Sequence, residues 1–252
     1  MTDYILQTEH IYKYFSGKRG KFSALEDINI ALSKGECLGI VGESGSGKST
    51  LARIVCCLEE PSEGKLFLEN NDITNLTAKE QRKIYQKIQM VFQNPTDSFD
   101  PRCTLHAGIS EGLKNLGRTQ KEILPKIEAL MDKCGLPAEL GKRYPYEVSG
   151  GQCQRAALVR ALAMEPEILV CDEITSNLDV SVQKQLMEFL QELKKTDKMS
   201  FLFICHDLAL VQQFCDRVVI MQKGKIVEAG ATEKIISMPE TEYTKLLMDA
   251  AF

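Results

Sequence analysis

The alternation of apolar and polar residues along this chain predicts an α/β protein. The N-terminal third shows short apolar stretches typical of strands, separated by turn signals at Ser16-Gly17 and Lys34-Gly35. Beyond Met164, apolar runs of strand length alternate with amphipathic helical patterns, which indicates a largely parallel sheet covered on both faces. The expected strands span residues 4–15, 22–33, 36–42, 64–70, 167–173, 200–206 and 217–224, and the expected helices between them span 48–60, 181–196 and 207–215.

The middle of the chain has a different pattern. From Pro95 to about Met164 the sequence shows helical periodicity, for example over residues 121–134, and no convincing strand. Pro125 lies within that helical pattern, so it either interrupts the helix or occupies its first turn. The expected organisation is a single domain of residues 1–252, with a sheet core of residues 1–93 and 165–252 and an inserted helical subdomain of about 94–164.

Composition and charge narrow the class of protein. With 252 residues, of which 44% are hydrophobic and 26% charged, the chain lies in the ordinary globular range. Its 31 Lys and Arg against 35 Asp and Glu give a net charge of −4, so no chain-wide basic field exists to hold nucleic acid nonspecifically. The N-terminus lacks the features of a secretory signal, and no apolar run approaches the length of a membrane span, so we expect a non-spanning chain in the cytosol.

Nine cysteines are scattered along the chain without any CxxC spacing. Their number is odd, and Cys37, Cys171 and Cys205 lie inside apolar runs. This distribution favours reduced thiols in the core over disulfides or a metal cluster.

A glycine-rich loop with the pattern GxxxxGK[ST] follows the predicted strand at residues 36–42 and precedes a predicted helix. In such a loop the backbone N–H groups surround phosphate oxygens, the lysine reaches the β and γ phosphates, and the serine hydroxyl ligates Mg²⁺. The alternative, a glycine-rich turn without a ligand, is disfavoured by the strand and helix on either side. The predicted ATP-binding residues of this loop are Gly42, Glu43, Ser44, Gly45, Ser46, Gly47, Lys48, Ser49 and Thr50.

Two adjacent carboxylates, Asp172 and Glu173, end the apolar run ILVCDE. Because ionised side chains are not tolerated inside a strand buried on both faces, they belong at the carboxyl edge of the sheet, where ligands bind. Asp172 suits an Mg²⁺ ligand, and Glu173 suits a base that polarises the attacking water. A solvated acidic turn is the alternative. His206 ends another buried strand at the same edge, a position that by itself is often incidental.

A second loop of serine and glycine, Ser149-Gly150-Gly151, opens the helical pattern QCQRAALVRALA. A helix N-terminus with these residues can seat a phosphate, although a capped helix start without a ligand gives the same pattern. Why one domain should carry two such loops is not explained by either motif alone.

The ordered set of motifs resembles that of the ATP-binding subunit of an ABC transporter, over essentially the whole chain. The set consists of the Walker A loop at residues 42–50, Gln93 in MVFQNP, the signature VSGGQ, the Walker B strand ILVCDE, SNLD ending at Asp179, and His206. The resemblance implies an α/β fold of the P-loop NTPase type, with an N-terminal antiparallel β region, an inserted α-helical subdomain, and ATP and Mg²⁺ as ligands.

The same resemblance implies roles for individual residues. Gln93 would contact Mg²⁺ and the attacking water, His206 would contact the γ-phosphate, and Asp179 would lie at a dimer seam. An aromatic residue near the end of the first strand would stack on adenine; Phe15 fits best by register, with Tyr12 and Tyr14 as competitors. The signature residues implied to complete the ATP site of a partner subunit are Ser149, Gly150, Gly151 and Gln152.

Two positions depart from the usual motifs of the family. Val148 replaces the leucine that commonly opens the signature, and Ile174 replaces the proline that commonly follows the glutamate. Neither exchange removes a chemical group from the expected site, so an active ATPase is still expected.

Within the family, residues 88–102 and 203–230 look closest to importers of peptides and of nickel. The chain ends without a cysteine after Cys215, and this shorter form resembles the nickel or metal-chelate branch. The resemblance implies a peripheral subunit on the cytoplasmic face of the membrane. Its expected partners are a second, non-identical ATP-binding subunit, two transmembrane permease subunits docking near Pro95 to Arg102, and, indirectly, a substrate-binding protein.

Two other classes of function remain as alternatives. A soluble ABC-type ATPase acting on nucleic acid or ribosomes is disfavoured, because such proteins resemble tandem cassettes or carry coiled-coil or zinc insertions. A P-loop kinase acting on a small metabolite would explain Lys48 and Asp172, but it gives no use for the signature loop. No nucleic-acid partner is therefore expected.

Overall fold

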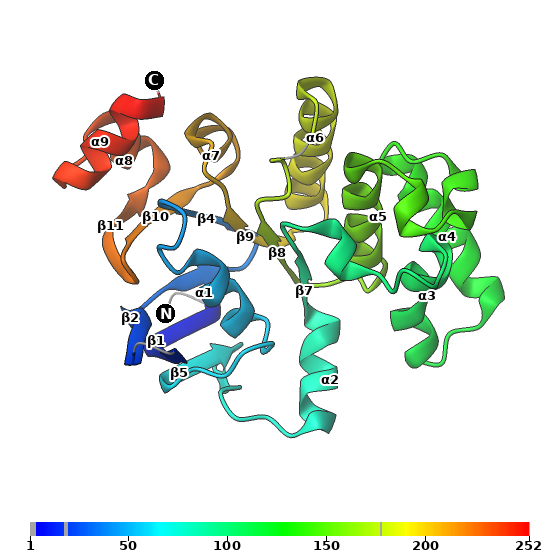
Figure 1. Cartoon of the computed structure of the whole chain (residues 1–252), viewed down its shortest axis with the longest axis horizontal. Helices are drawn as coiled ribbons and strands as arrows, with labels where there is room; N and C mark the ends of the chain where they lie inside the picture. The colour runs from blue at the N-terminus through cyan, green and yellow to red at the C-terminus, as the bar shows by residue number, and fades with distance from the viewer. Residues whose placement is uncertain (1–3, 18–19, 177, 252) are drawn as a thin grey trace.

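The computed structural model describes residues 4–17, 20–176 and 178–251, and its strands form two sheets (Figure 1). The first sheet is antiparallel and contains the order β2-β1-β5-β6, with β3 also paired to β1. Its strands are β1 (Tyr4–Gly17), β2 (Gly20–Ile28), β3 (Ala31–Ser33), β5 (Glu63–Leu68) and β6 (Asn71–Asp72). The expected N-terminal antiparallel region is therefore present.

The single strand predicted at residues 22–33 was wrong, because the chain turns between β2 and β3. Asp27 has a left-handed backbone with φ of 55°. The side-chain amide of Asn29 donates to the Asp27 carbonyl at 3.1 Å, a local bond that competes with a continuous ladder. Both short strands then pair with the long strand β1.

The second sheet has the order β11-β10-β4-β9-β8-β7 and is parallel except for the antiparallel pair of β10 and β11. This confirms the predicted largely parallel sheet. Its strands are β4 (Cys37–Val41), β7 (Ile88–Val91), β8 (Ile168–Asp172), β9 (Ser200–Ile204), β10 (Arg217–Gln222) and β11 (Lys225–Ala231).

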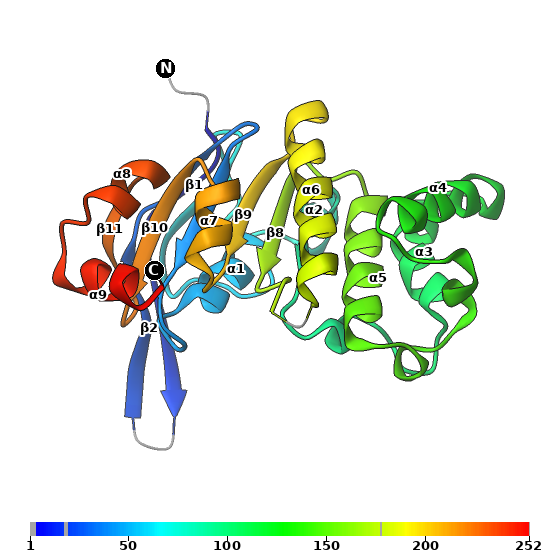
Figure 2. The ribbon, with the colours of Figure 1, turned by 90° about the horizontal axis from the view of Figure 1, so that it is seen from above.

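Both faces of the parallel sheet are covered, because side chains of successive strand residues point to opposite faces. On β4, Leu38 and Ile40 join a core cluster formed with α1 and the antiparallel sheet. Cys37 and Val41 join a second cluster formed with α5, α6 and α7. Helices α6 and α7 therefore lie on one face and α1 on the other (Figures 1 and 2). The helices are α1 (Lys48–Val55), α2 (Ala78–Lys87), α3 (Leu105–Asn115), α4 (Gln120–Lys133), α5 (Gly150–Ala163), α6 (Val180–Thr196), α7 (Leu208–Phe214), α8 (Thr232–Ser237) and α9 (Glu242–Ala251).

Helices α3, α4 and α5 gather at one end of the molecule, beyond strand β7 (Figures 1 and 2). Both expectations for Pro125 were wrong, because α4 runs through it in its second turn. Proline inside a helix costs about 3 kcal/mol or more. The buried side chains of Ile123, Ile127 and Met131 each contribute about 1.5 to 3 kcal/mol, so their packing outweighs that cost.

Helix α2 and strand β7 were not among the elements predicted from the pattern. None of the residues of α2 is buried, so the helix lacks the apolar stripe by which a sequence reveals it. Its start is fixed instead by a capping box between Thr77 and Glu80.

Cys37, Cys171 and Cys205 lie in the core as predicted, and all nine cysteines are free thiols. Within the described ranges, no helix combines the length and the apolar character that crossing a bilayer requires.

Candidate functional site

The glycine-rich loop joins the carboxyl end of β4 to the start of α1 at the edge of the parallel sheet. Its glycines permit close packing against other backbone segments of the same chain. A Cβ atom at Gly42 would lie 2.1 Å from the Met221 carbonyl oxygen, and one at Gly47, where φ is 103°, would lie 2.6 Å from that of Ala24. The loop conformation therefore requires glycine at both positions.

A cavity of about 980 Å³ opens over this loop. Segments far apart in the sequence line it, including Phe15, Gln93, Glu173 and His206. The loop residues that line the cavity are Gly42, Glu43, Ser44, Gly45, Gly47, Lys48, Ser49 and Thr50. Ser46 and Asp172 lie below its surface, with exposed fractions of 4% each. The structure thus gathers most of the predicted residues around one cavity.

Lys48 points back into its own loop. Its ammonium donates to the carbonyl oxygens of Gly42 at 2.7 Å and Glu43 at 2.8 Å. Burial lowers the pKa of this ammonium, while the nearby Glu173 and Asp172 carboxylates act in the opposite direction. A cation held by two neutral carbonyl groups can exchange them for a phosphate without being moved out of the loop.

The residues Asp172 and Ser49 fit a divalent cation. Asp172 ends β8 almost fully buried, and no described residue offers a hydrogen-bond partner to its Oδ1 atom. Burial raises the pKa of Asp172, and a hydrogen bond from Ser49 partly opposes that rise. An orphaned carboxylate oxygen beside a hydroxyl group is the oxygen donor set that Mg²⁺ takes when it also binds a nucleotide phosphate.

The residue after Asp172, Glu173, lies close to two other side chains at the same edge of the sheet, those of Gln93 and His206. The Gln93 amide donates to Glu173 Oε2 at 2.5 Å, and His206 Nδ1 lies 4.0 Å from the same oxygen. Glu173 has a left-handed φ of 49°, and its N–H donates to the Ile204 carbonyl at 3.0 Å. A non-glycine residue in this conformation is uncommon and is often found at active sites.

The structure also distinguishes the three aromatic candidates for adenine stacking. Phe15 lines the cavity, whereas Tyr12 and Tyr14 are not among its described lining residues and stack on each other with ring centroids 6.2 Å apart. Phe22, which sequence analysis missed, stacks on Phe15 at 5.6 Å and also lines the cavity. The two phenylalanines are cross-strand partners in the hairpin of β1 and β2, so only their pairing could have revealed the second ring.

The last described helix was a second omission of sequence analysis. Leu247 of α9 lines the cavity, as do Lys223 and Gly224 in the turn between β10 and β11. No motif marks these residues.

The signature residues lie elsewhere. Ser149, Gly150, Gly151 and Gln152 are not among the described residues that line the cavity, and α5 lies well away from α1 in both views (Figures 1 and 2). Ser149 caps α5: its hydroxyl accepts from the Gln152 N–H at 3.2 Å, and Gln152 Oε1 accepts from the Ser149 N–H at 2.9 Å.

Asp179, the other residue expected at a dimer seam, is the exposed N-cap residue of α6 and also lies outside the cavity. Asn177 of the SNLD motif lies outside the described residues.

A phosphate loop and a pair of strand-end carboxylates at one edge of a parallel sheet, with a separate serine-glycine loop at the start of a helix, define a nucleotide-hydrolysing cassette. Residues 25–176 match the model of the family described as ABC transporter, so this chain belongs to the ABC transporter family. It is 39% identical to the oligopeptide transport ATP-binding protein OppF of Bacillus subtilis, over 99% of this chain and 83% of that protein. It is 42% identical to OppF of Haemophilus influenzae, over 94% of this chain and 72% of that protein.

Solved structures agree with the fold. The dimeric ATP-binding cassette MJ0796, in a post-hydrolysis state bound to ADP and Pi, superposes with a TM-score of 0.85 at 26% identity, over 90% of this chain and 98% of that chain. CbiO1 from Clostridium perfringens, part of the ABC transporter complex cbiONQ, gives a TM-score of 0.79 at 28% identity, over 94% of this chain and 92% of that chain. The P-loop NTPase-type fold is confirmed, and the chain is an ATP-binding cassette with ATPase activity.

Proposed function

We propose that this chain powers an importer of peptides as one of two ATP-binding subunits that close head to tail on ATP. The observation that carries the proposal is the separation of two half-sites. The phosphate loop, Glu173 and His206 share one cavity, whereas Ser149 and Gly150 lie outside it and are exposed. Each cavity would be completed by the signature loop of the other subunit.

Gly150 supports this arrangement. A Cβ atom there would meet no described atom of this chain within 4 Å, and φ lies outside the left-handed region. Gly150 is the first residue of α5, and neither its backbone conformation nor the space around it requires glycine, so the chain itself gains nothing from it. Close approach of a nucleotide phosphate from another subunit is the requirement that glycine meets here.

The residues of the cavity divide the chemistry among them. Lys48 and the N–H groups of the loop bind the β and γ phosphates, and Phe15 with Phe22 forms an aromatic platform for adenine. Ser49 and Asp172 would hold Mg²⁺, which when bound supplies positive charge to the phosphate oxygens.

Glu173 accepts a proton from the attacking water, Gln93 orients the Glu173 carboxylate, and His206 donates to the γ-phosphate. In the partner's site, Ser149 and the amides of Gly150 and Gly151 bind the γ-phosphate. Gln152 braces the Ser149 backbone, and Asp179 borders the seam.

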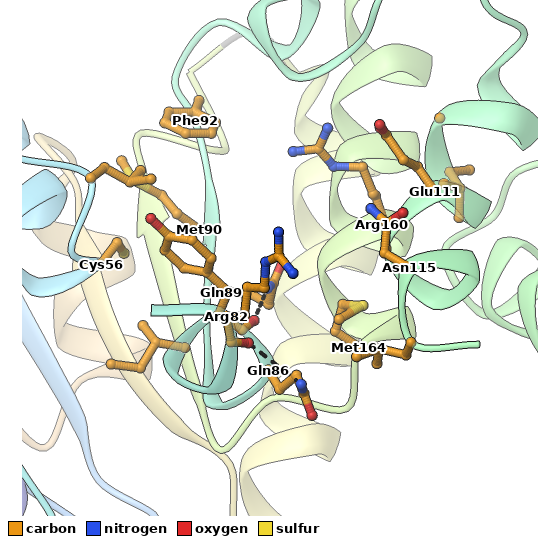
Figure 3. Close-up of a pocket in the computed structure, with 17 residues that line it drawn as sticks. Cys56, Arg82, Gln86, Gln89, Met90, Phe92, Glu111, Asn115, Arg160 and Met164 are labelled. Carbon is orange, nitrogen blue, oxygen red and sulfur yellow. Dashed lines mark hydrogen bonds between the residues drawn. The ribbon is translucent and has the colours of Figure 1, made fainter. Parts of the chain in front are cut away.

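The proposed permease contact is a second cavity of about 640 Å³ between the sheet core and the helical end (Figure 3). Cys56, Met90 and Phe92 lie along one side, and Glu111, Asn115, Arg160 and Met164 along the other (Figure 3). The exposed apolar side chains of Leu58 and Leu116 also line it. An apolar groove with a few polar groups suits an amphipathic helix of a permease.

The segment of residues 95–102, expected to form the docking groove, is not among the described residues that line this cavity. Phe99 of that segment is buried under the Arg160 guanidinium, 5.4 Å from its ring centroid, and the Arg160 guanidinium donates to the Ser98 carbonyl. Ser98 and Phe99 of this segment therefore contact Arg160, a residue of the wall of the groove.

Peptides, rather than nickel or metal chelates, are the proposed cargo because the relatives reported above are oligopeptide transport proteins. We further propose a peripheral location at the cytoplasmic membrane surface, a non-identical ATPase partner, two permease subunits and, through them, a substrate-binding protein. The division into a sheet core of 1–93 and 165–252 and a helical subdomain of 94–164 is part of the same proposal.

The test separates the two half-sites within the assembled transporter. Lys48→Ala should abolish ATP binding by this chain. Gly150→Asp should bind ATP with wild-type affinity yet lose ATPase activity at the partner's site, because a carboxylate would face the γ-phosphate. The control is Lys121→Ala, which changes an exposed residue of α4. Wild-type hydrolysis by Gly150→Asp would exclude the head-to-tail site.

The cargo is tested separately, by the response of the transporter's ATPase activity to peptides and to nickel. Turnover that nickel stimulates and peptides do not would exclude the peptide cargo.

A further inference from the structure

The last helix of the described chain lies against the phosphate loop, 200 residues away in sequence. The Glu43 N–H donates to the Tyr243 hydroxyl oxygen of α9 at 3.1 Å. Leu247, one helical turn further along α9, lines the nucleotide cavity. Because residues at i and i+4 share one face of a helix, a single face of α9 contacts both the loop and the cavity.

Helix α9 is held in this place by a buried carboxylate on β11. Glu228 accepts from the N–H groups of Glu240 at 2.9 Å and Thr241 at 3.1 Å, and from the Thr241 hydroxyl at 3.1 Å. Burial alone would raise the pKa of Glu228, but hydrogen bonding, first from the Thr244 side chain and then from Glu240 and Thr241, outweighs it, and the pKa is lowered. Met248 packs into the core from the same helix. The position of Tyr243 is therefore fixed by the sheet.

The peptide group that joins Gly42 to Glu43 is consequently held on both sides. Its N–H, from Glu43, donates to the Tyr243 hydroxyl oxygen, and its carbonyl oxygen, from Gly42, accepts from the Lys48 ammonium at 2.7 Å. When Lys48 turns to the β and γ phosphates of ATP, the Gly42 carbonyl loses this donor, and among the described residues the Tyr243 bond is the restraint on this peptide that remains.

We propose that Tyr243 is a positioning residue of the phosphate loop, which holds the peptide between Gly42 and Glu43 in place once Lys48 has moved to the nucleotide. This inference rests on the proposed function, in that ATP binds the loop. The restraint is redundant in the empty protein and needed in the complex. Removing it weakens ATP binding more than it weakens the empty fold.

Tyr243→Phe removes only the hydroxyl oxygen and is the main test. We expect the Kd for ATP to rise about threefold to tenfold, as for the loss of one net hydrogen bond, while the melting temperature of the empty protein stays near the wild-type value. The matched control is Ser237→Ala, at the last residue of α8. It removes a hydroxyl group that donates to the Glu233 carbonyl of the same helix at 2.7 Å. ATP titration by calorimetry and thermal unfolding measure the two quantities.

A second arm uses the empty protein alone. Lys48→Ala removes the other restraint, so adding Tyr243→Phe to it should lower the melting temperature by more than it does in the wild type.

A third variant again measures ATP binding. Glu228→Gln, which loosens α9 with Tyr243 intact, should also weaken ATP binding.

Unchanged ATP affinity in Tyr243→Phe, with a lower melting temperature of the empty protein, would overturn the inference and leave Tyr243 a merely structural contact. Additive melting temperatures in the Lys48→Ala background would overturn it as well. Failure of the wild-type chain to bind ATP would instead overturn the proposed function, so the two failures are distinguishable.

Discussion

Glu173 illustrates how backbone geometry prepares a side chain for chemistry. Its left-handed φ and the bond from its N–H to the Ile204 carbonyl fix the turn after β8. The Gln93 amide then holds the carboxylate, and His206 lies 4.0 Å away. Ile174, which replaces the proline usual in the family, is 2% exposed, so packing restrains the turn that proline would otherwise stiffen.

Glu173→Gln keeps the shape of the side chain and removes the base. We expect ATP binding to persist while hydrolysis falls by about 10² to 10⁴, the usual contribution of positioned proton transfer. Closed dimers should accumulate with ATP. Single-turnover phosphate release and size-exclusion chromatography with light scattering measure these effects. Turnover at the wild-type rate would remove Glu173 from the role of base.

At this scale the sequence predicted residues whose chemistry depends on local spacing. Lys48 and Asp172 follow from a loop pattern and from the end of an apolar run, and the structure places them at one sheet edge. Phe22 and Tyr243 were missed because their roles depend on neighbours across a hairpin and across 200 residues. No local pattern records such contacts.

Helix α5 has two roles, one in the core of the molecule and one at its surface. Its buried face packs into the same core cluster as α3 and α4, while its capped N-terminus is exposed. The reciprocal bonds between Ser149 and Gln152 leave the signature loop rigid before any partner arrives. The helix therefore presents a preformed surface.

Gly150→Ala should separate folding from function at this helix. Because no described atom lies near a Cβ at this position, we expect the isolated chain to gain about 0.4 to 1 kcal/mol in the free energy of unfolding. The assembled transporter should lose ATPase activity, since the methyl group would occupy the space of the partner's phosphate. Denaturant unfolding and ATPase assays measure the two effects. A stable variant with full activity would show that no ligand approaches Gly150.

Element boundaries were predictable where packing and periodicity agree, as in α6 and β9, and less so elsewhere. Helix α4 continues through Pro125 because its buried face outweighs the lost bond. Helix α2 escaped prediction because it buries none of its residues. Apolar packing thus decides α4 against its proline, whereas capping rather than an apolar pattern fixes the start of α2.

The whole molecule is a sheet core joined to a helical end (Figure 1). The cavity over the phosphate loop is lined by residues of the core. The second cavity lies between the two parts (Figure 3). Gln93, which follows β7, touches Glu173, and β7 also lines the second cavity. A movement of the helical end could therefore reach both cavities through one short segment.

Leu116→Glu should place a charge in the second cavity without touching the first. We expect the variant to bind ATP normally but to lose copurification with the permease subunits, because an unpaired carboxylate would be buried at the contact. Met238→Glu is the matched control, since Met238 is also an exposed apolar residue and is not among the described residues lining that cavity. Intact assembly of Leu116→Glu would place the permease contact elsewhere.

The bonds from Lys48 to the Gly42 and Glu43 carbonyls have a consequence for the end of the catalytic cycle. In the proposed function they would compete with the nucleotide, because ATP or ADP would have to displace them to reach the ammonium. ADP offers one phosphate fewer in exchange, so the loop can reclaim its lysine more readily from the product than from ATP. A loop that satisfies its own cation when empty would thereby ease the release of the product.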